Sequence, residues 1–165
     1  TSDDWGDRLM ADSGYSFTTE GAVALAAATA KTIIGVASHA NFGLSLTGWM
    51  LGFDGVTASA VPVLAEVCYS TWATNAPGTN STATTERQEY GRVITPGFTA
   101  AKTWTAEPTA LTVLQEFLLS PNGGLVVFEY PLGKEPDCAV SEGFALRLTA
   151  PAVVNARASM KVRRC

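Results

Sequence analysis

The sequence predicts an all-β protein, an antiparallel and jelly-roll-like β-sandwich with an extended N-terminal arm. Apolar and polar residues alternate along several stretches, most clearly over residues 144–149 and 154–162. Clusters of Gly, Pro, Asn and Asp separate these stretches, as turns separate short strands. No stretch combines helical periodicity with a capped start and a charged face. We place the arm at residues 1–19 and the sandwich domain at residues 20–165.

The arm mixes four aspartates with isolated large apolar residues and keeps neither the helix nor the strand period. We expect it to be ordered by contact with a partner, through Trp5, Leu9 and Met10. Simple disorder, or a helical turn over residues 7–12, is the alternative.

The Ala-rich stretch at residues 20–40 is the most ambiguous one. Its alanines favour a helix, but Val23 and Leu25 alternate with small residues, as do Ile34 and Val36. We predict two short strands joined by a turn at residues 29–32.

Two longer strands are expected next. Apolar anchors at Leu44, Leu46, Trp49, Leu51 and Phe53 predict a strand that ends in a turn at Asp54-Gly55. Residues 61–73, "VPVLAEVCYSTWA", predict a strand long enough to cross a sheet.

Residues 75–110 are rich in Thr, Ala, Gly and Pro, and they are too many for an ordinary structureless loop. We predict short strands near residues 90–94 and 100–104, with an excursion over the rim of the sandwich. Two hairpins complete the domain. Their turns are predicted at residues 121–124 and 150–152, each between apolar runs.

The composition narrows the classes of function. Charged residues form 16% of the chain, and the formal net charge is −4. Phosphate binding needs a Lys/Arg surplus, so we expect no nucleic-acid partner. No apolar run is long enough for a membrane span. A surface poor in charge suits a protein that contacts other chains, although a Thr-rich monomer surface would give the same composition.

The search for catalytic and metal sites is close to empty. His39 is the only histidine, and the three cysteines Cys68, Cys138 and Cys165 have no metal-ligand spacing. Cys68 falls in a strand and is expected to be buried, in a chain that folds in a reducing compartment. We expect no catalytic residue, no cofactor and no metal.

Carboxylates offer the remaining enzyme hypothesis, because two of them suffice for glycoside hydrolysis. Glu66, Glu116 and Glu129 lie within predicted strands, but on the polar parity, where a solvated face is expected. The single acids Asp54, Asp137 and Glu142 lack the oxygen ligands of a calcium site.

Tryptophans offer a binding hypothesis. Trp49, Trp72 and Trp104 would form a sugar-stacking platform if they were exposed. Burial in the core or between subunits is the expectation we favour for them.

Four phrases carry a resemblance to known proteins: "AATAKTIIGV", "FDGVTASAVPVLAEV", "GGLVVFEYPLGKEP" and "FALRLTAPAVVNARASMKV". They resemble small jelly-roll-like β-sandwich proteins among the virion genes of tailed bacteriophages, from about residue 21 to residue 162. The resemblance implies a head-associated decoration protein that is assembled in the host cytoplasm and located in the virion. The acidic arm and the three cysteines depart from the pattern.

The resulting expectation is a non-enzymatic capsid decoration or cement subunit that contacts the major capsid protein or another virion protein. A carbohydrate- or receptor-binding sandwich is the alternative. We also expect a homotrimer, because small neutral residues such as Ala22, Ala24, Ala145, Thr149 and Ser159 occupy the polar parity.

Overall fold

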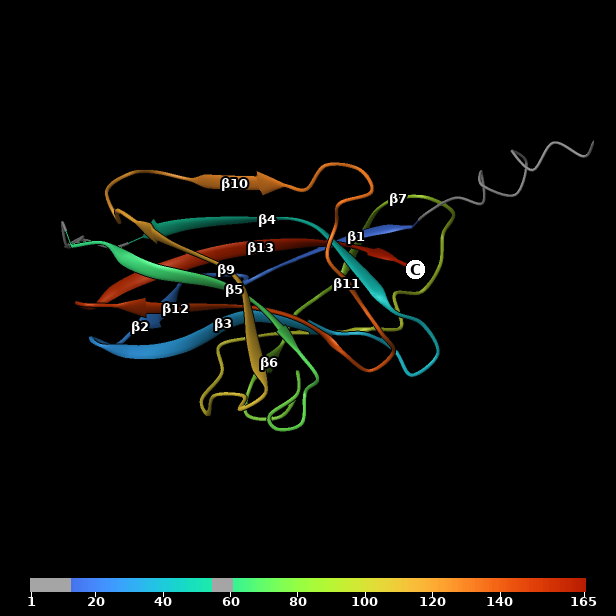
Figure 1. Ribbon diagram of the computed structural model, residues 1–165, viewed down its shortest axis with the longest axis horizontal. Helices are drawn as coiled ribbons and strands as arrows, with labels where there is room; N and C mark the ends of the chain where they lie inside the picture. The colour runs from blue at the N-terminus through green and yellow to red at the C-terminus, as the bar shows by residue number, and fades with distance from the viewer. Residues whose placement is uncertain (1–12, 55–60) are drawn as a thin grey trace, which may run out of the picture.

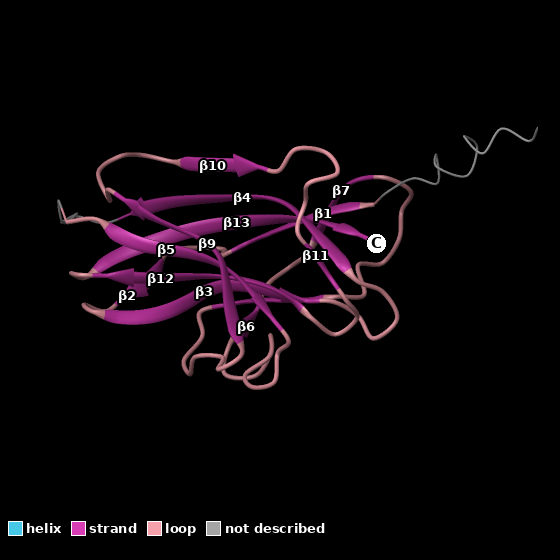
Figure 2. Cartoon of the chain, viewed as in Figure 1, coloured by secondary structure: helices cyan, strands magenta, loops and turns pink. Residues whose placement is uncertain are grey.

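A computed structural model describes residues 13–54 and 61–165 (Figure 1). The described chain forms two antiparallel β-sheets and contains no helix (Figure 2), which confirms the all-β, jelly-roll-like sandwich prediction. Sheet A contains β1 (Gly14–Thr18), β2 (Val23–Leu25), β4 (Leu44–Asp54), β7 (Arg87–Tyr90), β10 (Val126–Glu129), β11 (Asp137–Cys138) and β13 (Val154–Arg164). Sheet B contains β3 (Thr29–Ala37), β5 (Val63–Ser70), β6 (Thr82–Ala83), β8 (Thr99–Lys102), β9 (Leu111–Leu119) and β12 (Gly143–Ala150).

The chain alternates between the two sheets. Sheet A has the order β10-β4-β13-β1-β7, with β11 also on β4 and β2 also on β13, and sheet B has the order β6-β8-β3-β12-β5-β9. The connections β4 to β5, β9 to β10 and β12 to β13 therefore cross from one sheet to the other. This repeated crossing wraps the chain around a core that lies between the sheets.

Both predicted hairpins are wrong in their pairing. The strands on either side of residues 121–124 are β9, which pairs with β5, and β10, which pairs with β4. The strands on either side of residues 151–153 are β12 and β13, which also belong to different sheets. Pro, Asn and Gly reverse the chain equally well within a sheet and between sheets. The turns were therefore located correctly, but their sheets were not.

The predicted domain boundary at residue 19 falls too late in the sequence. Residues 14–18 form β1, which pairs with β13 on one side and β7 on the other. Tyr15 and Phe17 are fully buried, so the sandwich core already includes this segment. Trp5, Leu9 and Met10 lie outside the described residues.

The turn predicted at residues 29–32 is also wrong, because β3 already begins at Thr29. The chain turns just before it, where Ala28 has a left-handed φ of 54°. Its amide donates to the carbonyl of Ala150 at 2.7 Å, which fixes this conformation. The predicted turn at Asp54-Gly55 runs into residues outside the described ranges.

Residues 71–110 form a long excursion that closes one side of the sandwich. The predicted short strands lie at β7 and β8, slightly before the predicted positions. β7 extends sheet A beside β1, and β8 with β6 extends sheet B beside β3. Glu107 anchors the end of the excursion, because its carboxylate accepts bonds from the amide and the hydroxyl of Thr32 at 2.6 and 2.5 Å.

The excursion also covers part of the outer face of sheet B. Trp72 and Trp104 stack there at 5.8 Å, packed against Ala101 and Ala145. Each indole N–H donates to a backbone carbonyl, that of Val36 for Trp72 and that of Asn75 for Trp104. Ala145, expected on an open face, is therefore fully buried. The excursion has no strand period that would have revealed this cover.

Candidate assembly surface

The opposite side of the sandwich is bordered by β9 and β10. Each is the last strand of its sheet, and they follow one another in the chain (Figure 1). Within the described residues, no strand pairs with the outer edge of either one. Their sequences, LTVLQEFLL and VVFE, contain no Lys, Arg or Pro. Those are the residues with which proteins commonly prevent pairing at exposed sheet edges.

Large apolar side chains are exposed along this border. Leu118 is 67% exposed and Leu125 is 65% exposed. Three further residues of β9 and β10 have exposed apolar side chains: Val113, Leu114 and Val127. We call these five residues, with the free edges of β9 and β10, the β9–β10 edge. A bulge at Leu114 bends β9, so Gln115–Leu119 forms its straight part. Large apolar side chains exposed along unpaired strand edges are typical of interaction sites in soluble proteins.

An aromatic stack holds the two edge strands together from inside. The Trp49 ring lies 5.1 Å from Phe117 of β9 and 5.6 Å from Phe128 of β10, and all three rings are nearly parallel. Just after β10, the Tyr130 hydroxyl donates to the side chain of Gln115. Burial raises the pKa of Tyr130, which keeps this hydroxyl a donor. The edge is therefore a rigid surface supported by both sheets.

The outer face of β9 carries one acidic residue, Glu116. It lies opposite Glu66 of β5, and Leu118 lies opposite Leu64. Both oxygens of Glu66 accept from the Arg147 guanidinium, at 3.2 and 3.0 Å. This pairing raises the pKa of Arg147. No ion pair joins Glu116 to any described residue, so its charge stays available at the edge.

The predicted carboxylate candidates are thus divided between the sheets. Glu66 was expected on a solvated face but is buried, because it is paired with Arg147 and lies between β12 and β9. Glu116 is exposed beside it. Glu129 lies on sheet A, 4.0 Å from Lys161. The three acids therefore do not form one catalytic site.

The tryptophan platform is not available either. Trp49, Trp72 and Trp104 are all buried, as expected for core residues. Trp49 lies between two rings, and the other two indoles lie under the excursion. No face of these rings is left open for a sugar.

The other polar candidates are also isolated. His39 stacks on Phe42 and accepts from the Asn41 amide. Cys68 is buried as predicted, and burial raises the pKa of its thiol to about 11. Cys138 is buried in β11, and not in a polar loop, whereas Cys165 is exposed. Among residues 13–54 and 61–165, no group of His, Cys, Asp and Glu is arranged to hold a metal ion.

A groove of about 510 Å³ lies on sheet A, and Leu125 of the β9–β10 edge forms part of its wall. Met50, Gly52 and Phe53 line it, and Thr18–Gly21 form another part of the wall. Glycine at position 52 leaves the groove hollow, since an added Cβ would meet only Leu125, at 3.6 Å. Its size is suitable for an inserted side chain from a partner.

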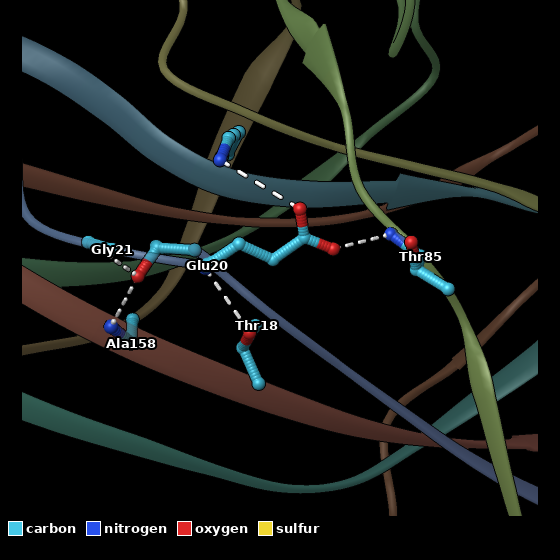
Figure 3. A network of polar contacts seen from close by, with 7 residues as sticks. Thr18, Glu20, Gly21, Thr85 and Ala158 are labelled. Atoms are coloured by element: carbon cyan, nitrogen blue, oxygen red, sulfur yellow. Dashed lines mark hydrogen bonds and ion pairs between the residues drawn. The ribbon is translucent and has the colours of Figure 1, made fainter.

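The polar groups beside this groove hold the fold together (Figure 3). One oxygen of Glu20 accepts from the Thr85 amide at 2.8 Å, and the other lies 3.8 Å from Lys102. The Thr85 amide, and to a lesser extent Lys102, lowers the pKa of Glu20. This carboxylate ties the excursion to the end of β1, so it is not free for chemistry.

A second groove, of about 290 Å³, lies elsewhere on sheet A. Lys161 lies 3.9 Å from Glu89 and 4.0 Å from Glu129, and Arg163 lies 3.5 Å from Glu135. Gly48 lies between Lys161 and Glu129 in the register and leaves room for their contact. Each of the two cations is thus paired with at least one carboxylate.

Sequence reasoning missed the residues of the β9–β10 edge. Its one available signal was that "TVLQEFLL" carries apolar residues on both parities, so that one face could not be covered by the core alone. The roles of Arg147 and Glu107 had no local signal, because their partners lie far away in sequence.

No protein family, curated protein or solved structure matches this chain. Among the described residues, no helix is both long and apolar enough to cross a membrane. The functional proposal therefore rests on the surface of the protein.

Proposed function

We propose that the protein is a non-enzymatic virion structural protein, a decoration or cement subunit that stabilises a phage capsid by bridging shell proteins. The observation that carries this proposal is the β9–β10 edge, where two edge strands without Lys, Arg or Pro, together with Leu125, expose five large apolar residues. A soluble monomer that kept this border in water would be prone to edge-to-edge association. A partner chain that covers it explains why the border is apolar.

The sequence resemblance to jelly-roll-like virion proteins supports the same proposal. The fold agrees with that resemblance, and the three tryptophans, Glu66 and Glu129 are engaged in structural contacts. A structural protein that acts only by binding other chains needs a stable scaffold and an uncovered surface. The described residues provide both, as a sandwich with an uncovered border.

We propose a homotrimer as the assembly state. A heterologous contact uses two different patches of the same chain and closes into a ring when the rotation permits. The small residues fit such a contact, because Ser159 lies on sheet A and Thr149 on sheet B. Ala145 takes no part, since the excursion buries it. Light scattering of the isolated protein at high concentration tests the trimer, and a monomer mass would contradict it.

The attachment experiment adds purified protein to undecorated shells and measures their resistance to heat. We expect the melting temperature of the shells to rise with occupancy. Absence of binding would contradict the proposed function. A deletion of residues 1–12 tests the arm separately. This deletion leaves β1 intact, whereas a deletion of the whole predicted arm, residues 1–19, would remove β1. We expect the deletion of residues 1–12 to abolish attachment and keep the oligomer.

The carbohydrate- or receptor-binding alternative has less support than the sequence suggested, since the three tryptophans are buried. The second groove, with Tyr130 and the ion pairs of Lys161, is the place where it would be tested. A glycan array discriminates the two, because a cement subunit is silent on it.

A further inference from the structure

The free edge of β9 has a pattern of side chains that specifies the chemistry of its partner. Gln115–Leu119 is straight, pairs with β5 on one side only, and lies beyond the bulge at Leu114. A sheet edge of this kind binds an extended segment by main-chain hydrogen bonds, and the alternating side chains then determine the sequence that fits.

On the outer face, the pattern is apolar, acidic and apolar. Glu116 stands between Leu118 and Val113, which are 67% and 38% exposed and lie opposite Leu64 and Cys68 on the same face of β5. Its neighbour Glu66 is already engaged by both oxygens with Arg147. A strand placed against β9 therefore needs a cation opposite Glu116, because an opposite charge is favourable there and a like charge is not.

On the inner face, the pattern is Gln115, Phe117 and Leu119, and the Gln115 side chain is already bonded to Tyr130. Phe117 is half-buried, and its ring stacks on Trp49 at 5.1 Å. Side chains of an added strand that point inward would extend this stack at the open border of the sandwich. A partner strand with apolar residues before and after its cation would therefore contact both faces of β9 favourably.

A second copy of β9 does not fit this requirement. Two copies of β9 could pair antiparallel about a two-fold axis at Gln115, Glu116 or Phe117. With the axis at Glu116, the two copies of Glu116 lie directly opposite one another, and with the axis at either neighbour they lie diagonally. Like charges so placed are destabilising. Natural edge strands use such charges to prevent self-pairing.

We propose that the free edge of β9 binds an extended partner segment of another protein, with a Lys or Arg opposite Glu116 and apolar residues on both sides of it. This proposal rests on the proposed role in assembly and names the chemistry of the partner. Its occupant is a strand donated by the partner chain.

The test uses two synthetic peptides, acetyl-Ser-Val-Ile-Lys-Ile-Val-Ser-amide and the same sequence with Glu in place of Lys. Calorimetric titration into the intact protein measures both affinities, and hydrogen exchange identifies the protected amides. We expect the Lys peptide to bind, the Glu peptide to bind at least about tenfold more weakly, and protection to appear over residues 115–119.

Two variants and a third peptide serve as controls. Glu116→Arg should reverse the preference between the peptides, and Glu89→Arg, on the opposite edge strand β7, should leave it unchanged. A Lys peptide with N-methylated amides on alternate residues should not bind, because it loses the main-chain donors. Thermal unfolding of each variant verifies that it is folded.

Three outcomes would overturn the proposal. These are no binding up to about 1 mM peptide, equal binding of both charges, or a preference that Glu116→Arg does not change. Protection, in the protein alone and without peptide binding, of those amides of residues 115–119 that point away from β5 would show that a second copy occupies the edge. Because no shell is present, failure here is distinguishable from failure of shell attachment.

Discussion

The outer face of sheet B near Trp72 and the β9–β10 edge are two surfaces that differ in how they are covered. Over the first, the excursion folds back and buries two stacked indoles with both N–H groups bonded. At the second, Leu118 and Leu125 remain more than half exposed. The chain can thus cover an apolar surface with its own residues, and at the β9–β10 edge no part of residues 13–54 and 61–165 does so. This difference supports the proposal that a partner covers the second surface.

The cover over the first surface holds residues in unfavourable conformations. Four residues of the excursion have a left-handed φ of 50–54°: Trp72, Asn75, Asn80 and Thr103. Such backbone persists only where surrounding contacts enforce it. The excursion is therefore a packed part of the structure, and its loss should be costly.

The largest expected effect is the loss of this cover. Trp104→Ala should lower the free energy of unfolding by about 3–5 kcal/mol, since Trp104 is 2% exposed and stacks on Trp72. Chemical denaturation measures the change. Trp104→Phe keeps a ring and should cost clearly less. A loss below about 1 kcal/mol for the alanine variant would show that the excursion contributes little.

Alkaline pH should lower the free energy of unfolding through Cys68 of β5. Burial raises the pKa of Cys68 from 9.0 to about 11, so the folded state holds this proton more tightly than the unfolded state. Its contribution is complete below pH 9 and is lost as the pH rises to about 11, by roughly 2–3 kcal/mol.

Denaturation at several pH values should therefore show a falling stability over this range, and Cys68→Ala should flatten the fall. The hydrogen bond to Glu142 raises the pKa of Tyr69 to about 12, so the ionisation of Tyr69 affects stability only at higher pH. An unchanged slope in the alanine variant would contradict the assignment to Cys68.

Two neighbouring glutamates provide a matched comparison of covered and open positions. Glu66→Ala leaves the Arg147 guanidinium without its partner and should cost about 2 kcal/mol. Glu116→Ala, one strand away, should change stability by less than about 0.5 kcal/mol. Denaturation of both variants tests the contrast. Equal losses would mean that Glu116 is part of the same ionic network.

The smallest effect on stability is expected at the open border. Leu118→Ser should leave the free energy of unfolding within about 0.5 kcal/mol, because this side chain is largely in water already. The same change should weaken attachment to shells, as a sedimentation assay would measure. Unaltered attachment would exclude Leu118 from the contact.

The sequence was sufficient to predict most of the long strands, although β1 was placed in the arm, and it was insufficient to predict which strands pair. The alternation of apolar and polar residues predicted β12 and β13 correctly, because one face of each strand packs on the core. The turn at residues 121–124 was also located, yet β9 and β10 belong to different sheets. Pairing depends on contacts between distant residues, and no local pattern records them.

The candidate site shows the same limit. Glu66 has the parity of a solvated residue, and only the opposing Arg147, 81 positions away, makes its burial acceptable. β9 is apolar on both parities, which usually indicates a strand covered on both faces. The sequence did not reveal that residues 13–54 and 61–165 leave the outer face of β9 exposed.

The position of β13 at the centre of sheet A has a consequence for the order of folding. This strand pairs with β1, β2 and β4, so the first and last described strands are direct neighbours. Sheet A cannot assemble before residues up to 164 are available. Folds dominated by such distant pairings fold slowly and expose unpaired edges while they wait. During synthesis, β1, β2 and β4 therefore lack the strand that joins them, and a newly made chain is most vulnerable to aggregation before β13 inserts between β1 and β4.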